Sequence, residues 1–144
     1  AVVLTGNWDA SGRQVPQLGS AYRTIGDRVY DDWLVGEIGG AADALHAAGA
    51  AQVAWLTLPP KLDEGPNPRF ERYTAMVTEV ASTRPWMRVV DYAGHMAAEP
   101  QNRSMRPDGS HLDQAGARRL WSTWLDEQIL GIAQHPQQEV VNSG

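Results

Sequence analysis

The chain has 144 residues, with 12 basic and 17 acidic side chains and a net charge of −5 at neutral pH. An apolar content of 42% against 20% charged residues indicates a globular chain, long enough for one domain with a hydrophobic core. The basic residues form no cluster of the kind that binds nucleic acid, and the lack of cysteine excludes disulfides, thiolate zinc sites and a thiol nucleophile.

Short apolar runs predict three strands, at residues 1–4, 52–58 and 88–92. The first two read as fully buried strands. Apolar residues spaced three and four apart predict three helices, over residues 29–48, over residues 69–83 and from residue 110 onward. The connecting segments are predicted as loops, the longest being 10–28 and 93–106. We expect the last helix to be capped by Ser110 with Asp113 in a capping box. This alternation of strand and helix predicts an α/β fold with a parallel sheet covered by helices.

The run from Arg106 to His111 follows the last predicted strand. Ligands of parallel sheets bind at the carboxyl ends of the strands, so this run should lie at the binding edge. Asp108 precedes His111 by three residues, which is close enough on one turn for the carboxylate to hold the imidazole N–H. Such a pair is the base half of a nucleophilic triad. The alternative is a plain Pro-Asp-Gly turn in which Ser110 only caps a helix.

A second candidate segment, Gly6-Asn7-Trp8, follows the first predicted strand. A glycine N–H and an asparagine side chain at a strand end could donate to an oxyanion, and Trp8 could shape a substrate pocket. The alternative is an ordinary loop rich in turn-forming residues. Asp91 and His95 could join Asp108 and His111 as metal ligands, but their spacing matches no dedicated metal motif, and we expect neither metal nor cofactor.

Taken in order, these motifs resemble those of the SGNH (GDSL-type) hydrolase family. They are Gly-Asn-Trp-Asp after the first strand, Leu-Pro-Pro after the second, Val-Val-Asp in the third, and then Arg-Pro-Asp-Gly-Ser-His-Leu. The last run is similar to the signature of SGNH domains fused to, or partnered with, membrane acyltransferases. The resemblance implies a three-layer α/β/α, flavodoxin-like fold over residues 1–134, lacking its first strands, followed by a polar tail at 135–144.

The resemblance also implies roles for individual residues. Asp108 and His111 match the block in which Asp orients the His that activates a serine. Gly6 matches the glycine of the Gly-x-Asn-Asp block, whose asparagine is an oxyanion donor. That asparagine position falls on Trp8, and Asn7 lies one residue early, so Asn7 would reach the site only from a shifted loop and Trp8 would line the pocket.

The family's nucleophile lies in a Gly-Asp-Ser block, which these 144 residues do not contain. Because the chain opens inside an apolar run, we expect sequence to precede it and to supply the serine. The resemblance then implies a serine esterase or acyl-transfer domain for ester-linked acyl groups, acetyl foremost, on carbohydrate-like substrates. The chain alone should be inactive. The alternative is an inactive SGNH-like module that binds a glycan or a partner protein.

The expected partners and location follow from the same resemblance. They are an ester substrate, a membrane acyltransferase domain and the missing N-terminal segment, in an extracytoplasmic setting at the cell surface or in the periplasm.

Overall fold

A computed structural model describes residues 1–63 and 67–134 of the chain. Its main sheet contains β1 (Val2–Val3), β4 (Val53–Leu56) and β5 (Met87–Val90). All three strands are parallel, in the order β1-β4-β5, and lie where the sequence predicts strands.

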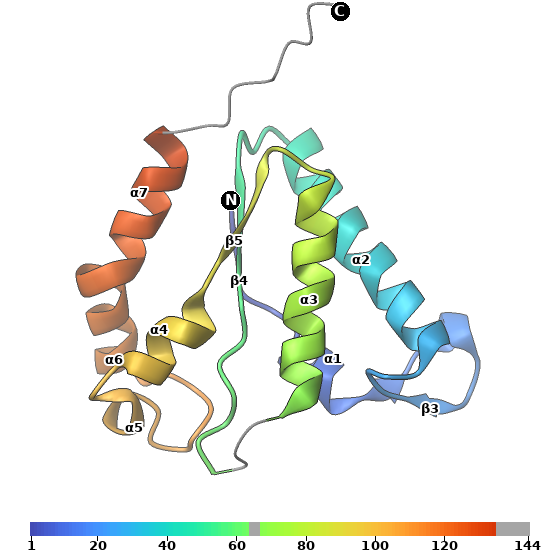
Figure 1. Ribbon diagram of the computed structural model, residues 1–144, viewed down its shortest axis with the longest axis horizontal. Coiled ribbons are helices and arrows are strands. Elements are labelled where there is room, and N and C mark those ends of the chain that lie inside the picture. The colour runs from blue at the N-terminus through green and yellow to red at the C-terminus, as the bar shows by residue number, and fades with distance from the viewer. Residues whose placement is uncertain (64–66, 135–144) are drawn as a thin grey trace, which may run out of the picture.

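The helices cover both faces of this sheet, as Figure 1 shows. On one side lie α2 (Arg28–Ala47) and α3 (Pro68–Ser82), close to the predicted bounds. On the other side lie α4 (Tyr92–Ala98), α6 (Gln114–Leu120) and α7 (Asp126–Gln134), the last two joined by the π-helical turn η2 (Trp121–Leu125). The predicted three-layer α/β/α fold with a parallel sheet is therefore confirmed.

The position of β4 in the centre of the sheet explains why its sequence is apolar throughout. Val53 and Trp55 belong to the core on the α2–α3 side, whereas Ala54 and Leu56 belong to the core on the opposite side. A parallel strand buried on both faces has no polar alternation.

The first strand differs from its prediction, because it is not fully buried. Within the described residues β1 pairs with β4 alone, so it is an edge strand of the sheet. Val2 is 47% exposed and Leu4, just beyond the strand, is 52% exposed. The apolar composition that predicted burial does not reveal how many strands lie beside it.

The segments predicted as long loops contain short elements. Residues 10–28 hold the end of α1 (Asn7–Ser11), a hairpin of β2 (Arg13–Gln14) and β3 (Tyr22–Arg23), and the 3₁₀ turn η1 (Pro16–Leu18). Residues 93–106 hold most of α4 and all of α5 (Asn102–Met105). The loop predictions are wrong because elements this short show no sustained period, and buried side chains such as Ala10 and Met96 fix them instead.

The last helix begins at Gln114, four residues later than predicted. Its cap is Asp113, whose side chain accepts the N–H of Gly116 at 2.6 Å. Ser110 is instead held in a turn, where its N–H is bound by the carboxylate of Asp108. The predicted role of Ser110 as the helix cap is therefore wrong. The predicted polar tail, 135–144, lies outside the described residues. None of the helices in the described part of the chain is both long and apolar enough to cross a bilayer.

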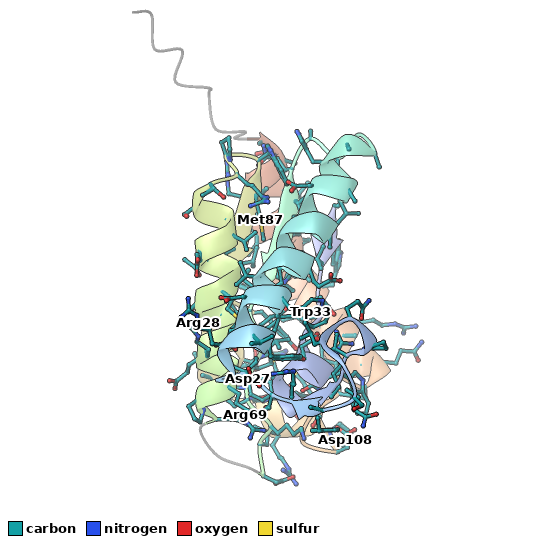
Figure 2. All side chains as sticks on the ribbon, turned by 90° about the vertical axis from the view of Figure 1, so that its right-hand side faces the viewer. Asp27, Arg28, Trp33, Arg69, Met87 and Asp108 are labelled. Atoms are coloured by element: carbon teal, nitrogen blue, oxygen red, sulfur yellow. The ribbon has the colours of Figure 1, made fainter. Side chains whose placement is uncertain are left out.

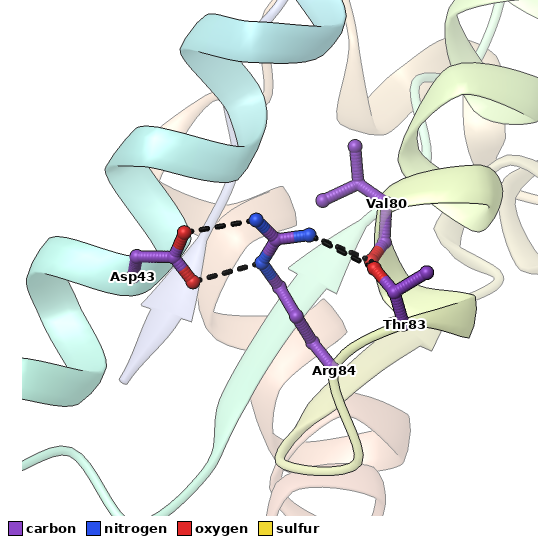
Figure 3. Close-up of polar contacts among 4 residues, drawn as sticks. All are labelled: Asp43, Val80, Thr83 and Arg84. Carbon is purple, nitrogen blue, oxygen red and sulfur yellow. Dashed lines mark hydrogen bonds and ion pairs between the residues drawn. The ribbon is translucent and has the colours of Figure 1, made fainter.

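An arginine clamp joins the carboxyl-terminal parts of α2 and α3, as Figure 3 shows. Arg84 Nε and Nη2 each donate to one carboxylate oxygen of Asp43 at 2.8 Å, while Nη1 donates to Val80 and Thr83. Gly39 leaves room for this guanidinium, because a Cβ there would lie 2.9 Å from Arg84 Nη2. The hydrogen bonds from Arg84 lower the pKa of Asp43.

We therefore predict a pH-dependent effect of Asp43→Asn on stability. Because the folded-state pKa of Asp43 is lowered, the clamp contributes stability above the unfolded pKa of about 3.9 and loses it as the pH falls further. Urea unfolding should give a lower free energy of unfolding for the variant than for the wild type at pH 7. This difference should shrink toward zero below a pH of about 3. Glu37→Gln, an exposed charge-matched control on α2, should show no such trend. A loss of stability in Asp43→Asn that does not depend on pH would show that the ionised Asp43 carboxylate does not stabilise the fold through Arg84.

Candidate functional site

The candidate site lies at the end of the molecule where the parallel strands finish. Asp108 lies toward the same end as Asp27 and Arg69, at the starts of α2 and α3, while Met87, at the start of β5, lies toward the other end (Figure 2). The predicted position at the carboxyl edge of the sheet is thus observed.

Asp108 and His111 are in direct contact, as their spacing predicts. His111 Nδ1 lies 2.7 Å from Asp108 Oδ2. The other carboxylate oxygen accepts the backbone N–H groups of His111 at 2.7 Å and Ser110 at 2.9 Å. These hydrogen bonds, the backbone bond from His111 foremost, hold the pKa of Asp108 well below its usual range.

The ionised carboxylate determines which imidazole nitrogen can act as a base. A carboxylate only accepts hydrogen bonds, so Nδ1 of His111 carries the proton and Nε2 has the free lone pair. Nε2 makes no hydrogen bond with the described residues, and the His111 side chain is 78% exposed. The pair can therefore orient one basic nitrogen toward a ligand.

The turn that carries this pair depends on Gly109. Its φ of +81° lies in the region that favours glycine, and its N–H donates to Arg106 at 2.8 Å. A Cβ here would lie 2.7 Å from Asp63 Oδ2, while the carbonyl of Gly109 accepts the N–H of Leu62 at 2.9 Å. The turn is thus packed against the loop that follows β4.

Arg106 fixes the same turn from inside the molecule. Its side chain is 1% exposed, with Nε donating to Asn102 Oδ1 at 2.8 Å and Nη1 donating to the carbonyl of Pro60 at 2.9 Å. Arg106 opens the motif that ends at His111, but the motif alone indicates no role for it. Its burial has no signature in the sequence, because arginine is most often exposed.

Gly6 fixes the second candidate segment. It caps α1 with a φ of +114°, and a Cβ at this position would overlap the ring of Tyr73. Tyr73 is itself buried in the core, where its hydroxyl accepts the indole N–H of Trp55 at 3.3 Å. Burial raises the pKa of Tyr73 to about 12. The backbone after β1 therefore packs directly onto α3.

A cavity of about 430 Å³ brings the two segments together. Gly6, Asn7 and Trp8 line it with His111, and Asp108 adjoins it through its bond to His111. Trp8 is 81% exposed, so most of its indole is free to meet a ligand. The structure thus gathers all five residues singled out from the sequence.

Other residues line this cavity that the sequence motifs do not predict as site residues. They are Leu4, Thr5, Leu58, Pro59, Lys61, Phe70, Tyr92, Ser110 and Leu112. Thr5 and Tyr92 each lie just after a strand, so the strand-edge rule could have found them. Phe70 comes from α3, and no local signal marks it.

The residues considered as metal ligands are placed differently. Asp91 caps α4 by accepting the N–H of Gly94 at 2.9 Å, and His95 stacks on Trp124 with ring centroids 4.0 Å apart. Over residues 1–63 and 67–134, no three His, Asp or Glu side chains are grouped so that they could hold a metal ion.

Comparison with known proteins gives one structural match. No family model matches the chain, and no curated protein matches it. A crystal structure of the lipase/acylhydrolase from Enterococcus faecalis is similar, with 20% sequence identity and a TM-score of 0.45. The match covers 72% of this chain and 55% of that one, so the chain spans about half the length of that protein. The three-layer fold rests on the strands and helices described above.

Proposed function

We propose that this chain carries the general-base half of an SGNH-type serine acyl hydrolase or acyltransferase, with the nucleophilic serine supplied from outside the 144 residues. The observation that carries the proposal is the 2.7 Å bond between His111 Nδ1 and Asp108 Oδ2 beside a cavity of about 430 Å³. The proposed substrate is an ester-linked acyl group, acetyl foremost, on a carbohydrate-like alcohol.

In the proposed reaction His111 Nε2 takes the hydroxyl proton of the serine as its oxygen attacks the acyl carbonyl. Asp108 keeps the proton on Nδ1 and stabilises the imidazolium that forms. His111 then returns the proton to the leaving alcohol, which leaves an acyl-enzyme. Water, or an acceptor alcohol, releases the acyl group by the same steps, with His111 again as base.

The segment after β1 is proposed to bind the substrate. The Gly6 N–H and the Asn7 side chain would donate to the oxyanion, since both line the cavity with His111. Trp8 offers an exposed aromatic face that could cover the apolar face of a sugar ring. This exposed face supports the carbohydrate-like substrate class.

Four serines of the described chain have backbone partners for their hydroxyls. The hydroxyls of Ser11, Ser82, Ser104 and Ser122 donate to backbone carbonyls close to them in sequence. Ser110 lines the cavity, but its hydroxyl makes no hydrogen bond to His111 within the described residues. These contacts support a nucleophile from elsewhere, either in a preceding segment of the chain or in an associated peptide.

Two partners and a location are also proposed. Exposed Val2 and Leu4, at the edge strand β1, support association with a preceding segment that would cover them. Association with a membrane acyltransferase domain, outside the cytoplasm, is proposed on the resemblance of the Arg106–His111 run alone.

A second candidate function is a catalytically inactive module that binds a glycan or a partner protein. The 81% exposure of Trp8 favours it, because a large apolar ring at a cavity is a common binding feature. The two candidate functions can be distinguished by the sequence that adjoins residue 1 in the native polypeptide. A Gly-Asp-Ser block after an apolar strand favours the enzyme, and an inert residue in place of that serine favours the module.

We predict that the 144-residue chain by itself is inactive as an esterase. Loss of the nucleophile alone removes most of the catalysis by a triad. Hydrolysis of p-nitrophenyl acetate by the chain should therefore equal that of its His111→Ala variant. Turnover by the chain that disappears in this variant would contradict an external serine.

A further inference from the structure

A tyrosine whose hydroxyl has no partner lies in the wall of the candidate site. Tyr92 lines the cavity of about 430 Å³ together with His111, and it is 3% exposed. Its hydroxyl forms no hydrogen bond with any residue of 1–63 and 67–134. Buried hydroxyls are nearly always hydrogen-bonded, because leaving one without a partner costs stability. The hydroxyl of Tyr92 is therefore a candidate for binding a ligand.

This hydroxyl opens to the cavity rather than into the core. Tyr92 Oη is not among the side-chain atoms of the described chain that are closed off from solvent and lack a partner. Because it does lack a partner, it reaches solvent through the small exposed part of the residue. The ring itself packs beside Trp124, with centroids 6.4 Å apart. The one polar atom of the side chain thus faces the space that His111 also borders.

The backbone on both sides of Tyr92 is fixed by hydrogen bonds. Asp91 accepts the N–H of Gly94 at 2.9 Å. Thr57 Oγ1 accepts the N–H of Ala93 at 2.9 Å and donates to Asp91 Oδ1 at 3.3 Å. Thr57 is buried, so these bonds lie inside the molecule. A donor that is held in place in this way needs little reorganisation when negative charge develops beside it.

The hydroxyl of Tyr92 keeps its proton at neutral pH. Burial raises the pKa of Tyr92 above its usual value, and the charge of Arg106 opposes this only in part. A protonated phenol donates one hydrogen bond, and a bond of this kind is stronger when the acceptor is an anion. Tyr92 is therefore suited to an acceptor that gains negative charge.

We propose that Tyr92 is a further catalytic residue, whose hydroxyl donates a hydrogen bond to the oxyanion of the acyl-transfer reaction. Negative charge collects on the acyl carbonyl oxygen when the serine oxygen adds to the acyl carbon. The hydroxyl of Tyr92 donates to this oxygen and keeps its own proton. Tyr92 follows β5, whereas Gly6 and Asn7 follow β1, so the oxyanion would receive bonds from two walls of the cavity. The inference rests on the proposed function.

Urea unfolding of the 144-residue chain tests whether the hydroxyl is free for this role. Tyr92→Phe should leave the midpoint unchanged or raise it, because the variant removes a polar atom that has no partner. Tyr30→Phe is the matched variant, since Tyr30 is also buried but its hydroxyl donates to the carbonyl of Asp9 at 3.2 Å. Its midpoint should fall. A midpoint that falls as far in Tyr92→Phe would show a partner within the fold and would overturn the proposal.

Steady-state kinetics of Tyr92→Phe in the complete enzyme tests the catalytic role. The variant should lower kcat by about 10²-fold and leave KM nearly unchanged, because the bond to the oxyanion forms in the transition state. Tyr30→Phe, which lies outside the cavity, should leave kcat within about twofold. Unchanged kcat in Tyr92→Phe, in an enzyme whose activity depends on His111, would overturn the role of Tyr92 alone. A wild type without His111-dependent activity would overturn the proposed function, and this inference with it.

A thionoester substrate distinguishes a bond to the oxyanion from an indirect effect on the site. In p-nitrophenyl thionoacetate a sulfur replaces the carbonyl oxygen of p-nitrophenyl acetate, and sulfur is a weak hydrogen-bond acceptor. Tyr92→Phe should therefore lower kcat by a smaller factor with the thionoacetate than with the acetate. An equal loss with the two substrates would overturn a hydrogen bond from Tyr92 to that atom.

Discussion

In the complete enzyme that the proposed function requires, His111→Ala should lower kcat for ester hydrolysis by about 10⁴-fold or more, because no other group would take the serine proton. Asp108→Asn should lower the same kcat by about 10⁴-fold, because an amide can leave the imidazole in the wrong tautomer. The 2.7 Å contact between Nδ1 and Oδ2 is the physical basis of both expectations. Steady-state kinetics on that complete enzyme measures both losses.

His46→Gln is the matched control for this prediction. His46 is an exposed histidine near the end of α2, where it stacks on Trp86 away from the cavity. Its replacement should leave kcat within about twofold, because it touches no group of the site. If kcat of His111→Ala were close to that of His46→Gln, His111 would not be the general base.

Gly6→Ala should destabilise the chain by about 2–6 kcal/mol. Its φ of +114° strains any residue with a Cβ, and the new methyl group would overlap the ring of buried Tyr73. Backbone strain costs about 1–3 kcal/mol and overpacking a core costs a similar amount, so the two together give this range. Urea unfolding followed by circular dichroism measures the loss.

Gly26→Ala separates the two causes of this loss. Gly26 has a similar φ of +102°, but a Cβ there would meet nothing within 4 Å. Gly26→Ala should therefore lose only the stability that backbone strain costs, about 1–3 kcal/mol. Equal losses at the two positions would mean that the contact between Gly6 and Tyr73 does not matter.

The long elements could be predicted from the sequence because each carries a sustained pattern. The 20 residues of α2 and the 15 of α3 show helical spacing over several turns, and β4 is apolar because both its faces are buried. The exposure of Val2 could not be predicted, since it depends on which strand lies beside β1. The short helices α1, α4 and α5 offer too few residues for a period.

The site shows the same division between local and long-range information. The spacing of Asp108 and His111 is local, and it predicts their contact. The prediction that Ser110 caps the helix is wrong, because the Ser110 N–H donates to the carboxylate of Asp108 and Ser110 therefore lies in a turn. The burial of Arg106 depends on a loop 46 residues earlier in the chain, which contains Pro60. No local sequence pattern can therefore predict it.

Labelling with a fluorophosphonate tests whether a serine outside these residues is activated by His111. The native polypeptide that carries these 144 residues, purified with any associated peptides, is labelled, digested and mapped by mass spectrometry, beside its His111→Ala variant. We expect a labelled serine outside residues 1–144 and loss of labelling in the variant. Labelling of a serine within these residues, labelling that does not depend on His111, or no labelled serine at all would contradict it.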